Sequence, residues 1–221
     1  MKKLRQPGKK ALSTLLIPIA LVGSIYLAPK KTHADINGSL EAIVSEKKEN
    51  SYARLNGFYQ LPGEINGFTF LEFYKDGKGF FGKSMLTKGL SKTFSVKGEL
   101  VHINEPVTYA GVGLGLNLPM PKGSYGSLKV LPVWVDKQGK YAPNKVIVGY
   151  VAGADLGKGW SMSSFGEANI AAKQGPKWCY GEVAVTKEIG KGVNVGYIPA
   201  LKPVGKLAPK LEHRIGVQIR F

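Results

Sequence analysis

The sequence has little of three residue types on which many functional sites depend. It contains one cysteine, Cys179, so the chain cannot form an internal disulfide, a cysteine-based zinc cluster or a redox pair. Of its three histidines, only His102 and His213 follow residue 35, and two separated histidines without an acidic pair on a loop do not predict a metal site. No glycine-rich phosphate loop stands between a strand and a helix. We therefore expect no metal and no cofactor.

Acidic residues are absent from the first 34 positions, which hold seven of the basic ones. Five basic side chains within residues 1–10 precede an uncharged, largely apolar stretch at 11–28, and this order is typical of a secretory signal peptide. We expect cleavage after Ala34, which gives a signal peptide at 1–34 and one domain at 35–221. The alternative is an uncleaved anchor helix, because eighteen uncharged residues just reach the length that crosses hydrocarbon; Pro18 and Gly23 weaken it.

The charge of the mature chain is still basic. Removing the seven early basic residues leaves 24 Lys and Arg against 15 Asp and Glu, a net charge of +9. This surplus suits anionic lipid head groups or small anionic solutes, and ordinary surface charge explains it equally well. We expect outer-membrane lipid as a partner and no nucleic acid.

Helical periodicity is also missing after Ile36, where a period of two replaces it. In 108–118, Val112 and Leu114 alternate with Gly111, Gly113 and Gly115. One face of this segment is therefore apolar and the other has almost no side chains. A soluble sheet rarely leaves its second face so bare, so the pattern favours strands that contact lipid on one side and a lumen on the other.

Such alternating segments recur along the whole mature chain, separated by turn residues. An even number of about twelve predicts an all-β, antiparallel, up-and-down transmembrane β-barrel with both termini on the periplasmic side. Short connections at 156–158 and 188–191 and longer ones at 137–144, 170–177 and 202–210 fit that orientation; a water-soluble barrel or sandwich is the structural alternative. The predicted strands are 36–45, 51–61, 65–75, 78–87, 92–102, 107–118, 126–136, 145–155, 159–169, 178–187, 192–201 and 211–221.

The last predicted strand ends on an aromatic residue. It alternates apolar Ile215, Val217, Ile219 and Phe221 with polar neighbours. In this it resembles the final strand of the Gram-negative outer-membrane β-barrel superfamily, and the resemblance implies that the barrel-assembly machinery recognises these four residues as an assembly signal. Twelve strands also resemble the nucleoside-channel family of small barrels, although no ligand motif of that family can be matched.

Polar residues on the opposite face of the strands predict the lining of a lumen. We expect basic and acidic residues to form a ladder of paired charges across it, which would screen solutes if the lumen is open and neutralise itself if side chains fill it. The first hypothesis is a small diffusion channel for hydrophilic, anionic solutes, and the second a plugged structural or adhesive barrel that binds lipid head groups. The pore-lining candidates are Arg54, Lys97, Glu99, Glu167, Asn169, Glu182, Asn194, Arg214, Gln218 and Arg220.

A third hypothesis is an outer-membrane lipid-modifying enzyme. It requires His102 or His213 as general base and Ser95 or a loop serine as nucleophile. No recognisable serine motif accompanies either histidine, so we assign no catalytic residue and expect a protein that is not an enzyme.

Overall fold

The computed structural model describes residues 37–74, 79–104, 108–136, 138, 140–141, 145–171, 175–204 and 208–221. The predicted signal peptide or anchor at 1–34 lies outside these residues. Among the described residues, no helix has the length and apolar character needed to cross a membrane. One short 3-10 helix, η1 (Lys48–Asn50), stands among strands.

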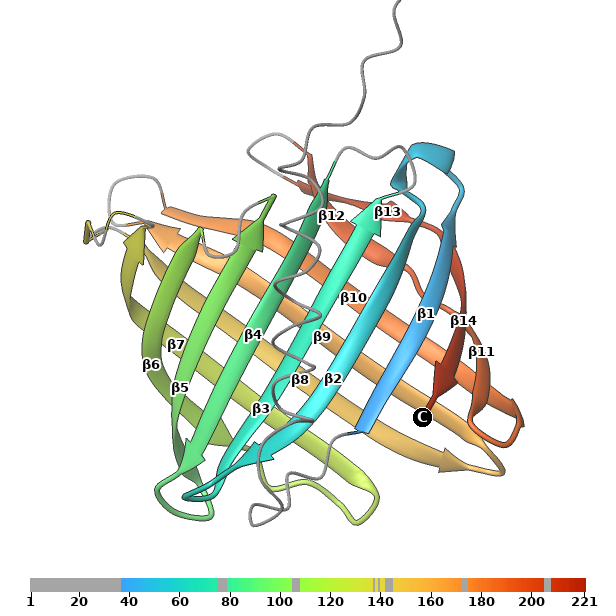
Figure 1. Cartoon of the computed structure of the whole chain (residues 1–221), viewed down its shortest axis with the longest axis horizontal. Helices are drawn as coiled ribbons and strands as arrows, with labels where there is room; N and C mark the ends of the chain where they lie inside the picture. The colour runs from blue at the N-terminus through green and yellow to red at the C-terminus, as the bar shows by residue number, and fades with distance from the viewer. Residues whose placement is uncertain are drawn as a thin grey trace, which may run out of the picture.

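The strands form one antiparallel sheet that closes on itself (Figure 1). Closure occurs where β1 pairs with β14 over seven residue pairs, from Ser39↔Arg220 to Ser45↔Arg214. The strands are β1 (Asn37–Ser45), β2 (Tyr52–Leu61), β3 (Ile65–Tyr74), β4 (Phe80–Gly89), β5 (Phe94–Ile103), β6 (Tyr109–Asn117), β7 (Ser124–Asp136), β8 (Val146–Gly157), β9 (Trp160–Ala171), β10 (Gly175–Gly190), β11 (Val193–Tyr197), β12 (Ala200–Val204), β13 (Ala208–Glu212) and β14 (Arg214–Arg220).

The fourteen strands in the described residues make a barrel of twelve. β11 and β12 are consecutive parts of one strand beside β10, interrupted at Ile198 and Pro199. β13 and β14 are likewise two parts of the next strand, interrupted at His213. The predicted fold, a twelve-stranded antiparallel up-and-down barrel, is confirmed, and the sandwich alternative is wrong because the sheet has no free edge.

The connections at the two ends of the barrel differ less in length than the sequence predicts. At the end that holds the start of β1 and Phe221, β8 and β9 are joined by Lys158 and Gly159, where Gly157, Lys158 and Gly159 all adopt positive φ. Two predicted long connections at the other end are wrong, because the strands extend further than expected. β9 and β10 are separated only by 172–174, and β12 and β13 only by 205–207.

A β-bulge in β7 places two bulky side chains on the same side of the sheet. The register between β6 and β7 shifts after Val112↔Val133, so that Leu131 and Pro132 lie opposite Gly113 alone. Proline, which has no N–H to donate, fits this unpaired position. A Cβ at Gly113 would lie 2.0 Å from the Val130 carbonyl oxygen, so the bulge requires glycine there. As a result Leu131 and Trp134 both enter the barrel, where they are 0% and 1% exposed.

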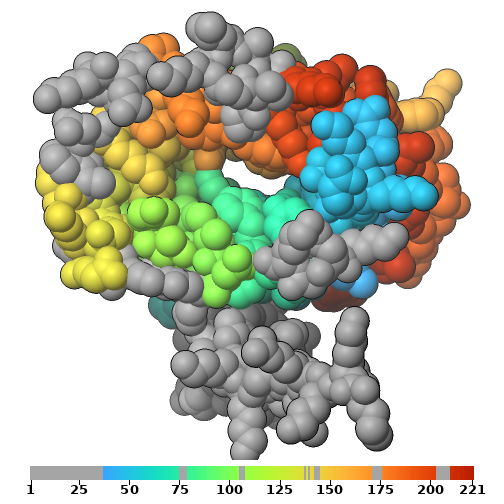
Figure 2. Space-filling view, turned by 90° about the horizontal axis from the view of Figure 1, so that it is seen from above, coloured from blue at the N-terminus to red at the C-terminus, as the bar shows by residue number. Residues whose placement is uncertain are grey.

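Viewed from above, the strands form a ring around a central hollow (Figure 2). The outer face carries a belt of large apolar side chains, among them Val44, Leu114 and Ile215, which are 64%, 58% and 61% exposed. The inner face carries almost all of the buried charged groups. This is the reverse of a water-soluble protein, and it is the arrangement that a hydrocarbon solvent demands.

Candidate functional site

The candidate site is the inner face of the barrel. All ten predicted lining residues occupy positions of the strand alternation that point inward, and Arg54, Glu99, Glu182, Asn194 and Arg214 are 7% exposed or less. Their contacts define two groups of paired charges. These are named here the arginine cluster (Glu41, Tyr52, Arg54, Glu72, Tyr180, Glu182, Glu212 and Arg214) and the lysine cluster (Lys83, Glu99, Lys129 and Glu167).

Arg54 stands at the centre of the arginine cluster. Its Nε and Nη2 donate to Glu72 Oε1 at 3.0 and 2.7 Å. Its Nη1 and Nη2 donate to the two oxygens of Glu182, both at 3.0 Å, and Nη1 lies 3.4 Å from Glu41 Oε2. The planar guanidinium thus bonds carboxylates on three different strands, β1, β3 and β10, a geometry that a lysine ammonium cannot reproduce.

Arg214 extends the same cluster toward the closure of the barrel. Its Nε donates to Glu212 Oε1 at 2.8 Å, and its Nη1 donates to the Tyr180 and Tyr52 hydroxyls at 2.7 and 3.0 Å. Tyr180 in turn donates to Glu182 Oε2 at 2.7 Å. The tyrosines therefore connect the two arginines through hydrogen bonds to a shared carboxylate.

The lysine cluster bridges the lumen. Lys83 on β4 and Lys129 on β7 each contact both Glu99 on β5 and Glu167 on β9, with Lys83 Nζ 3.1 Å from Glu99 Oε1. β4 and β9 are five strands apart in a ring of twelve, so the ion pair between Lys83 and Glu167 joins nearly opposite walls. Each amine faces two carboxylates and each carboxylate two amines, and the cluster is electrically neutral.

The sequence prediction of a charge ladder is therefore correct for some residues and wrong for others. Arg54 and Arg214 do pair with Glu182. Glu167 pairs instead with Lys83 and Lys129, which the sequence reasoning missed. Lys129 carried a usable signal, because Leu128 and Val130 flank it and point outward; Lys83 follows two phenylalanines and a glycine, which hide its alternation.

The other candidates line the wall without ion pairs to described residues. Lys97 donates to Thr87 Oγ1 at 3.1 Å, and Gln218 donates to Glu41 Oε1 at 2.6 Å. Asn194 and Arg220 both donate to Gln218 Oε1, at 3.3 and 3.1 Å. Within the described residues, the buried side-chain oxygen of Asn169 has no hydrogen-bond partner.

Apolar side chains also enter the lumen and narrow it. Val101, Leu131, Trp134 and Ile147 form one buried group, against which Phe81 and Tyr109 pack. Lys145, just before β8, lies 4.5 Å above the Trp134 ring and 4.3 Å above the Tyr109 ring, and burial lowers its pKa. A second group, Ile43, Tyr52 and Ile198, lies on the wall at the barrel closure.

The charge of the lumen is balanced although the chain is basic. Six carboxylates, on Glu41, Glu72, Glu99, Glu167, Glu182 and Glu212, face six cations, on Arg54, Lys83, Lys97, Lys129, Lys202 and Arg214. Arg220 also points inward, but it is exposed at the tight-turn end. The basic surplus therefore lies at the two ends of the barrel. Described lysines there are Lys88, Lys92, Lys122, Lys158 and Lys191 at the tight-turn end, and Lys47, Lys48, Lys140, Lys145, Lys177 and Lys210 at the other.

The histidines lie on the outer face, away from the lumen. His102 Nε2 is 3.2 Å from Ser84 Oγ, and the His213 ring stacks on Tyr197 with centroids 6.0 Å apart. Ser95, the predicted nucleophile, is 1% exposed and occupies the opposite face of β5 from His102, so these two cannot form a catalytic pair. In the described part of the chain, no three His, Cys, Asp or Glu side chains gather as a metal site would require.

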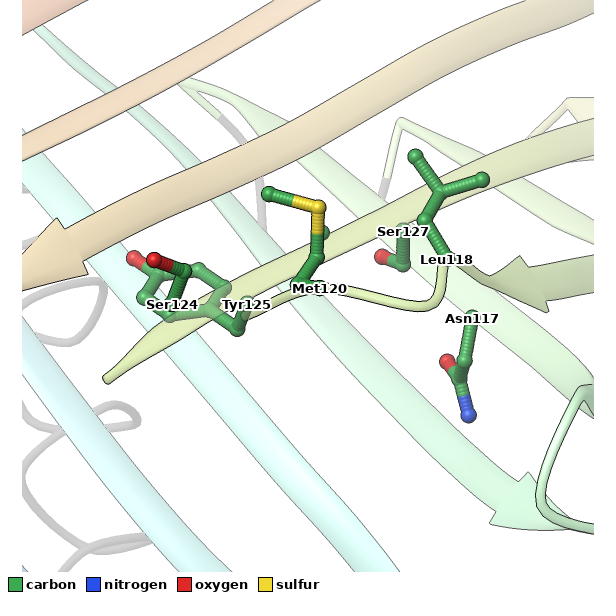
Figure 3. Close-up of a pocket in the computed structure, with 7 residues that line it drawn as sticks. Asn117, Leu118, Met120, Ser124, Tyr125 and Ser127 are labelled. Atoms are coloured by element: carbon green, nitrogen blue, oxygen red, sulfur yellow. The ribbon is translucent and has the colours of Figure 1, made fainter. Parts of the chain in front are cut away.

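One open pocket of about 380 Å³ lies at the tight-turn end, where β6 passes into β7 (Figure 3). Leu118, Met120 and Tyr125 line it with Asn117, Ser124 and Ser127. No carboxylate, amine, imidazole or thiol borders it. It therefore offers no chemistry comparable to that of the lumen.

Comparison with known proteins identifies the fold and leaves the function open. No protein-family model matches the chain, and no curated protein does. Among solved structures, it is similar to the NanC porin, with a TM-score of 0.57 at 9% identity, over 82% of this chain and 98% of that one. The translocator domain of the autotransporter NalP from Neisseria meningitidis also matches over 96% of this chain, at 12% identity, but with a TM-score of only 0.30. The chain thus has the fold of an outer-membrane β-barrel.

Proposed function

We propose that this protein is an outer-membrane barrel that acts as a narrow diffusion channel for small hydrophilic solutes. The observation that carries the proposal is the inner face, where paired charges on opposite walls surround a hollow (Figure 2). A barrel whose only task is structural can fill its interior with side chains, as eight-stranded barrels do. Twelve strands enclose more space than that, and less than the wide channels of sixteen.

The distribution of charge suggests how solutes are selected. Lysines at both ends raise the local concentration of small anions at the entrances. Inside, the balanced clusters give a transverse field without a net sign, so solutes are screened by size and by how they orient. We therefore propose a weak preference for anions that originates at the ends.

The alternative is a barrel closed to solutes, whose lysine-rich ends bind lipid head groups. The low exposure of the arginine cluster favours it, because Arg214 and Glu212 are only 2% and 3% exposed. Single-channel recordings in planar bilayers separate the two. Stepwise conductance, with a reversal potential displaced toward that of chloride in a KCl gradient, is the expected result. If the correctly folded protein produces no conductance steps, the channel proposal is wrong and the closed barrel is correct.

The last strand supports a further proposal, that Ile215, Val217, Ile219 and Phe221 are recognised by the barrel-assembly machinery. The Phe221 N–H and C=O both bond to Gly38, each at 3.0 Å, and a Cβ at Gly38 would lie 2.5 Å from the Phe221 ring. Phe221 therefore belongs to the seam that closes the barrel. Before closure the last strand has unpaired backbone groups, which lipid does not tolerate.

Deletion of Phe221 should reduce the amount of folded barrel in outer-membrane fractions about tenfold. A factor of this size corresponds to roughly 1.4 kcal/mol. The measurement is the fraction of protein with heat-modifiable gel mobility, in cells and after refolding in detergent. Assembly recognition predicts a loss in cells with near-normal refolding in vitro. An equal loss in both settings contradicts it and assigns Phe221 to seam stability alone. Replacing Leu118, an outward apolar residue in the connection after β6, with alanine is the control, because it removes an apolar side chain and keeps the backbone bond to Gly126.

A further inference from the structure

Four polar side chains interrupt the apolar outer face across β2, β3, β4 and β5. The Tyr59 hydroxyl lies 3.3 Å from Thr69 Oγ1, Thr69 Oγ1 donates to Ser84 Oγ at 3.1 Å, and Ser84 Oγ lies 3.2 Å from His102 Nε2. This hydrogen-bonded row is named here the outer polar row. Each of its members occupies an outward position of its strand, the face that elsewhere carries residues such as Leu86 and Leu100, both 37% exposed.

The local sequence is arranged so that this row can form. Thr69 and Ser84 are direct cross-strand partners, and His102 pairs with Gly82, two residues along β4 from Ser84. Tyr59 reaches Thr69 by lying over Gly67, where a Cβ would be 2.0 Å from the Tyr59 ring. Polar groups facing hydrocarbon are costly unless they are bonded or used, and here each hydroxyl is bonded to the next.

We propose that the outer polar row is a second site, one that hydrolyses carboxylic esters of membrane lipids. Ser84 and His102 have the geometry of a nucleophile and its general base. The proposal shares with the channel only the premise that the outer face meets lipid. It goes beyond the transport function, because no residue of the row enters the lumen.

The chemistry assigns one role to each side chain. Ser84 Oγ attacks the carbonyl carbon of the ester while its proton passes to His102 Nε2, with the ring protonated on Nδ1. The Thr69 hydroxyl donates a hydrogen bond to the oxyanion, and Tyr59 is a positioning residue that holds Thr69. The bond to the alcohol breaks, and His102 returns the proton to the leaving oxygen. A water then loses a proton to His102 and adds to the acyl group on Ser84. As the bond to Ser84 Oγ breaks, His102 returns that proton to the serine oxygen and the fatty acid is released.

The surroundings of Ser84 suit an acyl chain. Its partner on β5 is Leu100, and two residues further along that strand Gly98 leaves the surface open, since the nearest atom to a Cβ there is that of Leu86 at 3.9 Å. Leu86 and Leu100 flank this open strip. His102 lies next to the last residue of β5, at the barrel end opposite the tight turns, so the ester of a lipid in the outer leaflet stands at the height of the serine.

The outward serine Ser164 provides a matched control. Its hydroxyl lies 3.1 Å from the Tyr150 hydroxyl, so it too is bonded to a phenol on the outer face, and no histidine is among its described partners. In detergent micelles, a fluorophosphonate probe should label the unmodified protein and Ser164→Ala and fail to label Ser84→Ala. Hydrolysis of p-nitrophenyl octanoate should fall about 1,000-fold in Ser84→Ala and in His102→Ala.

Two further measurements make the result unambiguous. Heat-modifiable mobility and channel conductance report folding, and neither should change in the variants because the row lies outside the lumen. Release of fatty acid from phosphatidylethanolamine vesicles or from lipopolysaccharide identifies the lipid source. A folded protein that neither takes up the probe nor hydrolyses any of these esters overturns the proposal, and so does equal labelling of Ser84→Ala. Absence of conductance would contradict the channel and not the ester-hydrolysing site, because no residue of the outer polar row enters the lumen.

Discussion

Replacing Arg54 with methionine should lower the free energy of unfolding of the barrel by about 3–5 kcal/mol, because it leaves buried carboxylates without their cation. Glu72 and Glu182 each accept two hydrogen bonds from the guanidinium. Both are buried, at 7% and 5% exposure, so water cannot replace the lost donors. Urea titration in detergent micelles, followed by tryptophan fluorescence, measures the change.

The matched control is Lys97→Met, which removes an inward cation of the same barrel. Lys97 donates one hydrogen bond, to Thr87, and has no ion pair among the described residues, so its loss should cost only about 1 kcal/mol. The double variant Arg54→Met with Glu182→Gln should recover part of the stability, since it removes one of the unpaired charges. Equal losses for Arg54→Met and Lys97→Met would show that the arginine cluster is not the stabilising element.

The strand plan of this barrel was predictable because its two solvents are so different. Lipid outside and water inside force alternation on every strand, and a segment such as 108–118 shows it directly. The first strands were harder to assign because aromatic residues face both ways. Four aromatic rings point inward and form a row in which each contacts the next: Phe58, Phe68, Phe70 and Phe81. The centroids of successive rings are 4.7, 6.0 and 5.8 Å apart. Tyr59, beside Phe58 in the chain, points outward.

The partners across the lumen could not be predicted in the same way. Alternation says that Glu167 points inward, but which residues it meets depends on how far the closed sheet is sheared. Lys83 and Lys129 reach it from β4 and β7, strands that lie 84 and 38 residues away in the chain. The interruptions at Pro199 and His213 could not be predicted either. Each divides one barrel strand into two shorter strands, so the chain has fourteen strands in its described residues and a barrel of twelve.

The outer polar row could not be predicted from the sequence for a related reason. Ser84 and His102 are eighteen residues apart, and only the antiparallel pairing of β4 with β5 brings them together. Ser95 is closer to His102 in the chain, but the two positions differ by seven, an odd number, and the period of two therefore places them on opposite faces. Proximity in sequence is therefore a poor guide to catalytic pairs in a sheet.

The lysine cluster should set the conductance of the channel. The double variant Lys129→Ala with Glu167→Ala removes one cation and one anion that pair with each other, so the net charge is unchanged. Because Glu167 is gone, its bridge to Lys83 across the lumen, between β9 and β4, is lost as well. The remaining pair, Lys83 and Glu99, stays on neighbouring strands at 3.1 Å. We expect single-channel conductance to rise by about twofold or more, because the narrow section widens without a change in its charge.

The single variant Lys129→Ala tests the charge of the same section separately from its width. It leaves Glu99 and Glu167 with Lys83 as their shared cation, so the lumen gains one negative charge. The reversal potential in a KCl gradient should then move toward potassium, whereas the double variant should keep that of the unmodified protein. As a control at the end of the barrel, Lys158→Ala should change the reversal potential slightly and the conductance hardly at all. If the double variant conducts like the unmodified protein, solutes pass elsewhere in the hollow and the lysine cluster does not form the constriction.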